Sequence, residues 1–146
     1  MEHICAIRLL AVGVFLLTEG IKDWRKKEID LIFPALISVL AILFVFVFKD
    51  IGWIEILLGF VQGLVLIGVS FLTDGGIGEG DGIVFCVTGL MLGWKMNLMI
   101  IFISSFICAL TSIILMILKK ADKKTKIPFI PFTVPAYLVT VLINYQ

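Results

Sequence analysis

Apolar runs long enough to cross a membrane recur along this sequence and constrain its fold more than any other feature. A helix of about 20 mostly apolar residues spans a hydrocarbon core of about 30 Å. The chain has 146 residues, 61% of them hydrophobic and 16% charged, which is more apolar surface than one small core can bury. We therefore expect an all-α integral membrane protein, a bundle of about six transmembrane helices that forms a single membrane-embedded domain over residues 1–146. The expected helices cover about Ile4–Ile21, Ile29–Phe48, Trp53–Leu72, Ile83–Trp94, Leu98–Leu118 and Ile127–Ile143.

Glycines mark the third run and the break that follows it. Gly59, Gly63 and Gly68 are expected to let the third helix approach a neighbour closely. The break at residues 74–82 is too rich in glycine to continue a helix. The fourth run, Ile83–Trp94, would reach only about 18 Å as a helix. Either the glycine-rich loop lies below the membrane surface, or this short fourth helix is half-buried among its neighbours.

Basic residues indicate how the chain is oriented. The segments after the first and fifth runs, residues 22–28 and 119–126, are rich in lysine and arginine, and no other connection holds more than one basic residue. Such segments stay in the cytoplasm, so six crossings place both termini outside the cytoplasmic membrane and the glycine-rich loop inside. Asp23, just after the first run, and Asp81, at the start of the fourth, are therefore predicted at the same cytoplasmic face.

Two carboxylates that converge at one place can act as an acid/base pair. Like charge and partial removal from water leave one acid protonated and the other ionised. The ionised acid deprotonates a water while the protonated acid polarises a peptide carbonyl, and the pair then returns the proton to the leaving amine. Peptide hydrolysis of this kind needs no metal and no cofactor, and we expect neither in a chain with one histidine and three dispersed cysteines. The net charge of +1 indicates no nucleic-acid partner.

A helix-end role for Asp81 is the simpler alternative. An aspartate in the first turn of a helix interacts with unpaired N–H groups and the helix dipole. That role would not require the three alternating glycines Gly76, Gly78 and Gly80, which permit positive φ and a close backbone approach. The glycines therefore favour a site at which a substrate backbone lies against the loop.

Three segments, in order, resemble the motifs of the type IV prepilin and preflagellin peptidases. Residues Gly78–Asp81 read Gly-Glu-Gly-Asp and match the GxGD motif of that family. Asp23–Ile29 matches its first motif, an aspartate followed by a basic stretch, and Pro128–Phe132 matches its Pro-Phe segment. The resemblance covers about Ile21 to Phe132. It implies a membrane aspartic endopeptidase that cleaves the leader peptide of type IV pilin-like precursors at the cytoplasmic face, with Asp23 and Asp81 as the catalytic acids.

The chain departs from the family pattern at two positions. Ile83 occupies the place of a lysine that usually follows the GxGD aspartate by two residues, and Asp30 occupies the place of a proline. The chain also has no CxxC pair. It therefore resembles the short, peptidase-only form of the family, for which no methyltransferase activity is expected.

The resemblance also implies the partners, which are the lipid bilayer and precursors with a short basic leader followed by a hydrophobic helix. Arg25, Lys26 and Lys27 either help to dock that leader or act as an orientation signal in contact with anionic lipid. Glu19 and Glu55 lie near the ends of runs, so we expect their side chains to extend to the membrane interface.

Two functions outside the peptidase class stay open. In a transporter or ion-translocating subunit, the same carboxylates would bind a cation or relay protons, but the runs offer few polar residues beyond Gln62, serines and threonines. In a structural membrane protein, the glycine-rich loop would be a turn, and Asp81→Asn would leave function intact.

Overall fold

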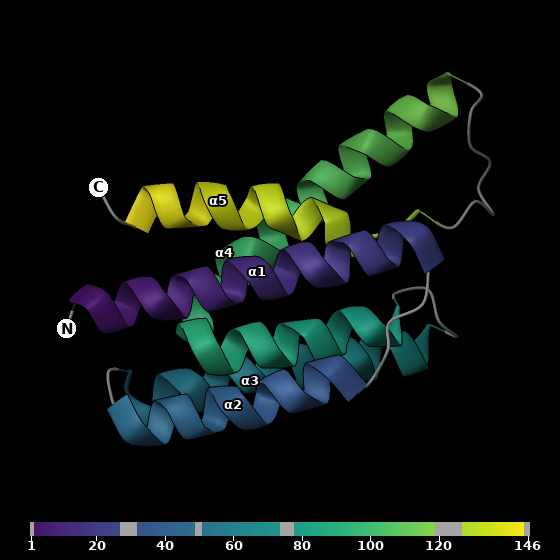
Figure 1. Cartoon of the computed structure of the whole chain (residues 1–146). Coiled ribbons are helices and arrows are strands. Elements are labelled where there is room, and N and C mark those ends of the chain that lie inside the picture. Colours follow the sequence, from purple (N-terminus) through teal and green to yellow (C-terminus); the bar gives the residue numbers. More distant parts are fainter. Residues whose placement is uncertain (1, 27–31, 49–50, 74–77, 119–126, 145–146) are drawn as a thin grey trace.

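The chain folds as a set of apolar helices that run side by side. The structure, a computed structural model, describes residues 2–26, 32–48, 51–73, 78–118 and 127–144. All regular structure in these residues is helical, and α1, α3 and α4 are long and apolar enough to cross a membrane. The expectation of a helical membrane protein is thus confirmed. The elements, shown in Figure 1, are α1 (Glu2–Lys26), α2 (Ile32–Phe48), α3 (Trp53–Leu72), α4 (Glu79–Ile117), the 3₁₀ turn η1 (Ile130–Phe132) and α5 (Thr133–Asn144).

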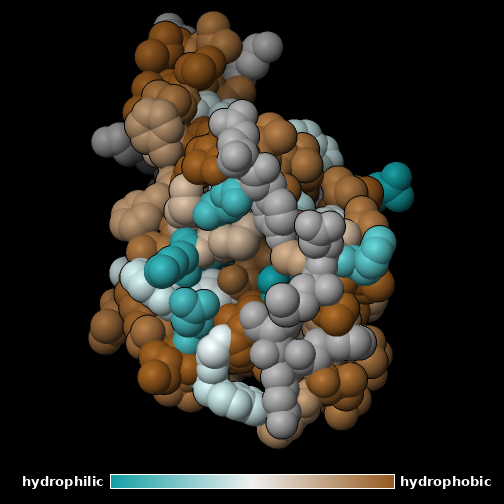
Figure 2. Space-filling model, turned by 90° about the vertical axis from the view of Figure 1, so that its left-hand side faces the viewer, coloured by the Kyte–Doolittle hydropathy of each residue, from teal (hydrophilic) through white to brown (hydrophobic). Residues whose placement is uncertain are grey.

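The outer surface is hydrophobic, as contact with lipid requires. Large apolar side chains face outward along all five α-helices, and Leu72 is 86% exposed. Figure 2 views the molecule from one end and shows hydrophobic residues over most of that face, with smaller groups of hydrophilic residues near its middle and at one edge. An exposed apolar surface of this extent indicates a partner such as lipid rather than water.

The prediction of six separate spans is not supported, because only α1, α3 and α4 among the described residues are long and apolar enough to cross a membrane. α4 itself consists of two helices that meet at a kink. α4 bends at Gly93, where φ is 76° and ψ is 174°, a conformation that glycine adopts far more readily than other residues. Nδ2 of Asn97 donates to the carbonyl of Phe85 at 3.2 Å, although residues twelve apart in a straight helix would lie about 18 Å apart. The first arm (residues 79–92) and the second arm (residues 94–117) therefore fold back on one another (Figure 1).

Glycines bring α3 and the first arm of α4 into very close contact. A Cβ on Gly59 would collide with the backbone of Gly89, and a Cβ on Gly63 would collide with the backbone nitrogen and Sγ of Cys86. The expectation of close packing is confirmed at both positions. It is wrong for Gly68, which faces open space.

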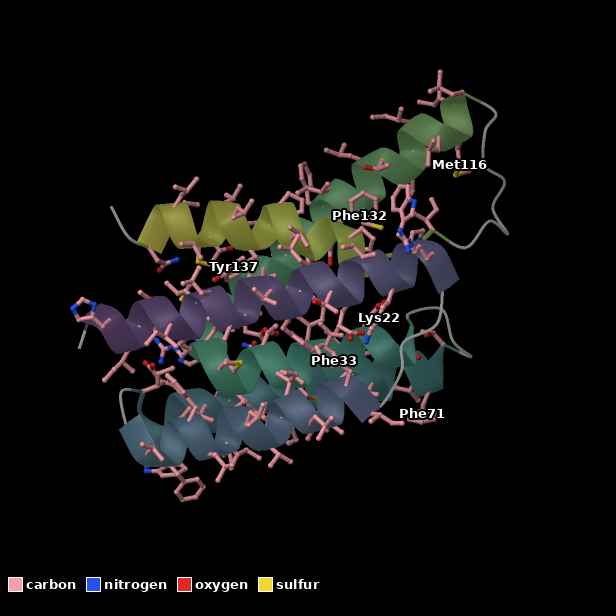
Figure 3. All side chains as sticks on the ribbon, in the orientation of Figure 1. Lys22, Phe33, Phe71, Met116, Phe132 and Tyr137 are labelled. Atoms are coloured by element: carbon pink, nitrogen blue, oxygen red, sulfur yellow. The ribbon has the colours of Figure 1, made fainter. Side chains whose placement is uncertain are left out.

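Helix ends differ from the predicted ones at the two sides of the candidate site. α1 continues to Lys26, so Asp23 lies within the helix rather than after it. The last run does not become helical at Ile127, because Pro131 lacks a backbone N–H and forms part of the 3₁₀ turn η1 before α5 begins at Thr133. Further along, the hydroxyl of Tyr137 on α5 donates to the carbonyl of Leu9 on α1 at 2.7 Å and ties the two helices together (Figure 3).

Candidate active site

Asp23 and Asp81 lie at the same end of the helical bundle. Asp23 is in the last turns of α1 and Asp81 is in the first turn of α4, and Figure 1 shows η1 near the same end. Each aspartate is only 8% exposed. The charge of Asp23 acts on Asp81, so the two carboxylates are within electrostatic reach of each other. The fold thus brings together two acids that are far apart in the sequence.

Asp23 is held by the backbone of the segment that leads into α5. A carboxylate near the C-terminal end of a helix is disfavoured by the helix dipole, so it needs other donors. The backbone N–H of Ile130 donates to Oδ2 of Asp23 at 3.0 Å, and the backbone N–H of Phe129 also interacts with this carboxylate. Gly20 lies beside this segment, and a Cβ there would be in ordinary van der Waals contact with Cα of Pro131 at 3.5 Å. The Pro-Phe segment therefore positions Asp23.

Asp81 occupies the third position of α4, where Gly78 is the N-cap residue. Its backbone N–H donates to the carbonyl of Gly78 at 3.0 Å, and its carboxylate interacts with the backbone N–H of Gly78. An acidic side chain is favourable in this first turn. The helix-end interpretation is therefore correct in part. Asp81 is in addition buried and exposed to the charge of Asp23, and a helix-end role requires neither.

Gly78 makes room for the carboxylate of Asp81 rather than adopting positive φ. Gly78 has φ −63° and ψ 129°, and Gly80 is helical, so the expectation of positive φ is wrong at these two positions. A Cβ on Gly78 would lie 3.0 Å from Oδ2 of Asp81. Gly76 lies outside the described residues.

A cavity of about 250 Å³ adjoins Asp81. Its walls come from α3, both arms of α4 and residues 127–129, and Asp81 and Gly78 are among the residues that line it. The rings of Phe85 and Phe129, which also line it, meet edge to face with centroids 6.0 Å apart. The backbone of Phe129 thus interacts with Asp23, and its ring contacts Phe85, which lies one helical turn after Asp81.

The other residues singled out in the sequence are placed less fully. Arg25 is exposed near the end of α1, and α1 ends at Lys26. Lys27 lies outside the described residues, as does Asp30. Ile83 is half-buried in the first arm of α4. Within the part of the chain that the structure describes, no three His, Cys, Asp or Glu side chains gather closely enough to hold a metal ion.

Glu19 is a third acid of this region that the sequence analysis assigned to the membrane interface. That expectation is wrong, because its side chain is fully buried. Nζ of Lys22 lies 3.0 Å from Oε1 of Glu19 and 4.1 Å from the ring centroid of Phe33, so α1 and α2 share this cation (Figure 3). The sequence did contain a signal for the position of Glu19. Glu19 precedes Asp23 by four residues, which places both acids on one face of α1. Glu55, by contrast, is exposed as expected.

A buried polar network at the bend of α4 was not predicted from the sequence. Asn97 is fully buried, and its amide bonds to Thr88, to Gln62 and to the carbonyls of Gly59 and Phe85. Gln62 in turn donates to the carbonyl of Trp94 at 3.1 Å. A single asparagine beside a long apolar run was the only signal in the sequence. The network fixes how the second arm leaves the bend.

Fold and site together define a helical membrane protein with two buried aspartates at one end of its bundle. The model of the type IV leader peptidase family matches residues 10–113, a stretch that includes both aspartates. The chain belongs to the type IV leader peptidase family, and the resemblance seen in the sequence is confirmed. Comparisons with curated proteins and with solved structures gave no significant match.

Proposed function

We propose that this protein is an aspartic endopeptidase that removes the leader peptide from type IV pilin-like precursors at the cytoplasmic face of the cell membrane. The observation that carries the proposal is the burial of Asp23 and Asp81 within electrostatic reach of each other, beside a cavity that adjoins Asp81. Membership of the type IV leader peptidase family supports precursors with a leader peptide as the substrates. Hydrolysis by two acids needs no further group from the protein.

In the proposed reaction, one acid is ionised and the other protonated. The ionised acid takes a proton from a water, whose oxygen adds to the carbonyl carbon of the scissile peptide. The protonated acid donates a hydrogen bond to the carbonyl oxygen, a role that we assign to Asp81 because it lines the cavity. As the C–N bond breaks, the leaving nitrogen receives a proton from the pair. The N–H groups of Ile130 and Phe129 hold Asp23 in place throughout.

The proposed orientation follows from charge. The end that carries both aspartates also carries the basic stretch around Arg25, so we assign it to the cytoplasm. The start of α1 and the end of α5, which lie at the other end of the bundle (Figure 1), would then lie outside. Arg25, Lys26 and Lys27 have the same sign of charge as the basic leader that the resemblance implies. Contact with anionic lipid is therefore the role that we propose for them, in place of leader docking.

The polar network of Asn97 does not favour a transporter. Both atoms of its amide group bond to protein groups, at distances between 2.6 and 3.3 Å. A pathway for ions or substrates would need polar groups that are free to exchange partners. The network therefore stabilises the fold.

Cleavage of a type IV pilin precursor by the purified protein tests the proposal. Asp23→Asn and Asp81→Asn should each reduce the rate at least about 100-fold, the contribution typical of a positioned acid or base. Asparagine keeps an oxygen that can accept the bond from Ile130, so the fold should persist, as circular dichroism would check. Glu55→Gln, which neutralises an exposed acid on α3, is the matched control and should cleave like the unmodified protein. Near-normal cleavage by either aspartate variant would disprove the mechanism.

A further inference from the structure

The second arm of α4 supplies one wall of the cavity beside Asp81. Ile101, Ser105 and Cys108 line the cavity from this arm, and their spacing of four and three residues places them on one face of the helix. Cys108 is close enough to Asp81 to interact with its charge. The same arm turns Phe102 and Phe106 outward, with 67% and 66% of each exposed. One face of the arm therefore belongs to the site and another faces the surroundings of the bundle.

Ser105 differs from the other hydroxyl residues of this arm. Ser104, Thr111 and Ser112 each donate to the carbonyl four residues earlier, at 2.6 to 2.8 Å. Ser105 is exposed and makes no such bond within the part of the chain that the structure describes. Its hydroxyl therefore keeps its capacity to donate and accept a hydrogen bond for another partner. A peptide in the cavity could supply that partner through its backbone.

The lining of the cavity selects which part of a precursor fits. Apart from Asp81, Ser105 and Cys108, the side chains that line it are apolar, among them Leu66 and Phe85. Placing a basic leader there would remove its charges from water at a high cost. The apolar segment that follows the cleaved bond carries no such cost.

We propose that the precursor segment just after the cleaved bond lies against the face formed by Ile101, Ser105 and Cys108, with Ser105 bonded to its peptide backbone. This inference rests on the proposed function, because it takes Asp81 as the point of cleavage. An extended chain advances about 3.3 Å per residue, so Cys108 should meet the first few residues after the cut. The second arm of α4 then guides the precursor from the site into the membrane.

Disulfide cross-linking through the native Cys108 tests the placement. The Asp23→Asn variant, which should bind without cleaving, also carries Cys5→Ser and is oxidised with pilin precursors that have one cysteine at successive positions on either side of the cut. We expect at least fivefold more cross-linking to the first four positions after the cut than to leader positions. The matched control carries Cys108→Ser and Phe106→Cys and presents its thiol from the outward face. Equal cross-linking by the control, or cross-linking of Cys108 only to the leader, would overturn the inference.

A kinetic comparison of neighbouring serines tests the role of Ser105 without cross-linking. Ser105→Ala should raise KM about threefold to tenfold and leave kcat almost unchanged, as the loss of a bond to bound substrate predicts. Ser104→Ala removes a buried hydroxyl that is already bonded within the helix, so it should change KM less than twofold. Equal effects of the two variants would contradict a substrate contact.

The same assays separate this inference from the proposed function. If the unmodified protein cleaves a precursor but Cys108 forms no cross-link to it, the placement is wrong and the peptidase assignment stands. If it cleaves none of a panel of pilin precursors, the proposed function fails and the placement fails with it.

Discussion

Replacing Asn97 with leucine tests the polar network that holds the bend of α4. Leucine has the same branched arrangement of side-chain atoms as asparagine, although it is larger, and it has no group that can form a hydrogen bond. The variant loses the bond from Oγ1 of Thr88 at 2.6 Å and the bond from Nδ2 to Oε1 of Gln62 at 3.0 Å. It also loses two bonds to the carbonyls of Phe85 and Gly59, at 3.2 and 3.3 Å.

The size of the effect follows from these contacts. Nδ2 has two hydrogens for its three acceptors, so the contacts amount to about three full bonds at a time. In membrane proteins, a side-chain hydrogen bond between helices contributes about 0.6 kcal/mol on average, so Asn97→Leu should lower the free energy of unfolding by about 2 kcal/mol, which is roughly a 30-fold change in the folding equilibrium. The apolar side chain of leucine should recover little of this, because its immediate neighbours are polar groups of the same network.

Reversible unfolding by sodium dodecyl sulfate in mixed micelles, followed by circular dichroism, measures this free energy. The matched control is Asn144→Leu, which removes an exposed asparagine near the end of α5 and should change the free energy by less than about 0.5 kcal/mol. If Asn97→Leu were as stable as the control, the network would not be what holds the two arms of α4 together.

Two further predictions concern the packing of α3 and the anchoring of Asp23. Gly63→Ala should destabilise the fold by about 1–3 kcal/mol, because the added Cβ collides with Cys86. Gly68→Ala adds its Cβ in open space, so it should be neutral or stabilising in the same unfolding assay. Similar effects of the two variants would argue against close packing at Gly63. Asp23→Ala removes the acceptor of the Ile130 N–H, so hydrogen exchange of that amide should become about tenfold faster or more, and Asp23→Asn should change it less. Unchanged exchange in Asp23→Ala would mean that the bond does not hold the segment.

The features that depend on local sequence were predicted well. The third helix has the expected bounds, Trp53–Leu72, because a charged or glycine-rich break flanks each of its ends. The glycines Gly59 and Gly63 face a neighbouring helix as expected. The catalytic roles of Asp23 and Asp81 stay a prediction, although the structure does place both acids at one end of the bundle.

The features that depend on contacts between distant residues were not predicted. Hydropathy separates the two apolar runs of α4 but cannot show that they fold back on one another, which depends on positive φ at Gly93 and on the bonds of Asn97 across the bend. It also could not show that Glu19 is buried, because that depends on which face of α1 meets its neighbours. The Pro-Phe segment was recognised by resemblance, but its contact with Asp23 joins residues 107 apart.

The central claim is that Asp23 and Asp81 act as one unit, and a double-mutant cycle tests it most directly. Single-turnover cleavage of a pilin precursor would be measured with the unmodified protein, with Asp23→Asn, with Asp81→Asn and with the double variant. If the two acids form one catalytic pair, either single variant should lose nearly as much rate as the double variant, because half of a pair cannot carry out the reaction. Rate losses that multiply independently, or a single variant that keeps more than about a tenth of the rate, would contradict the account.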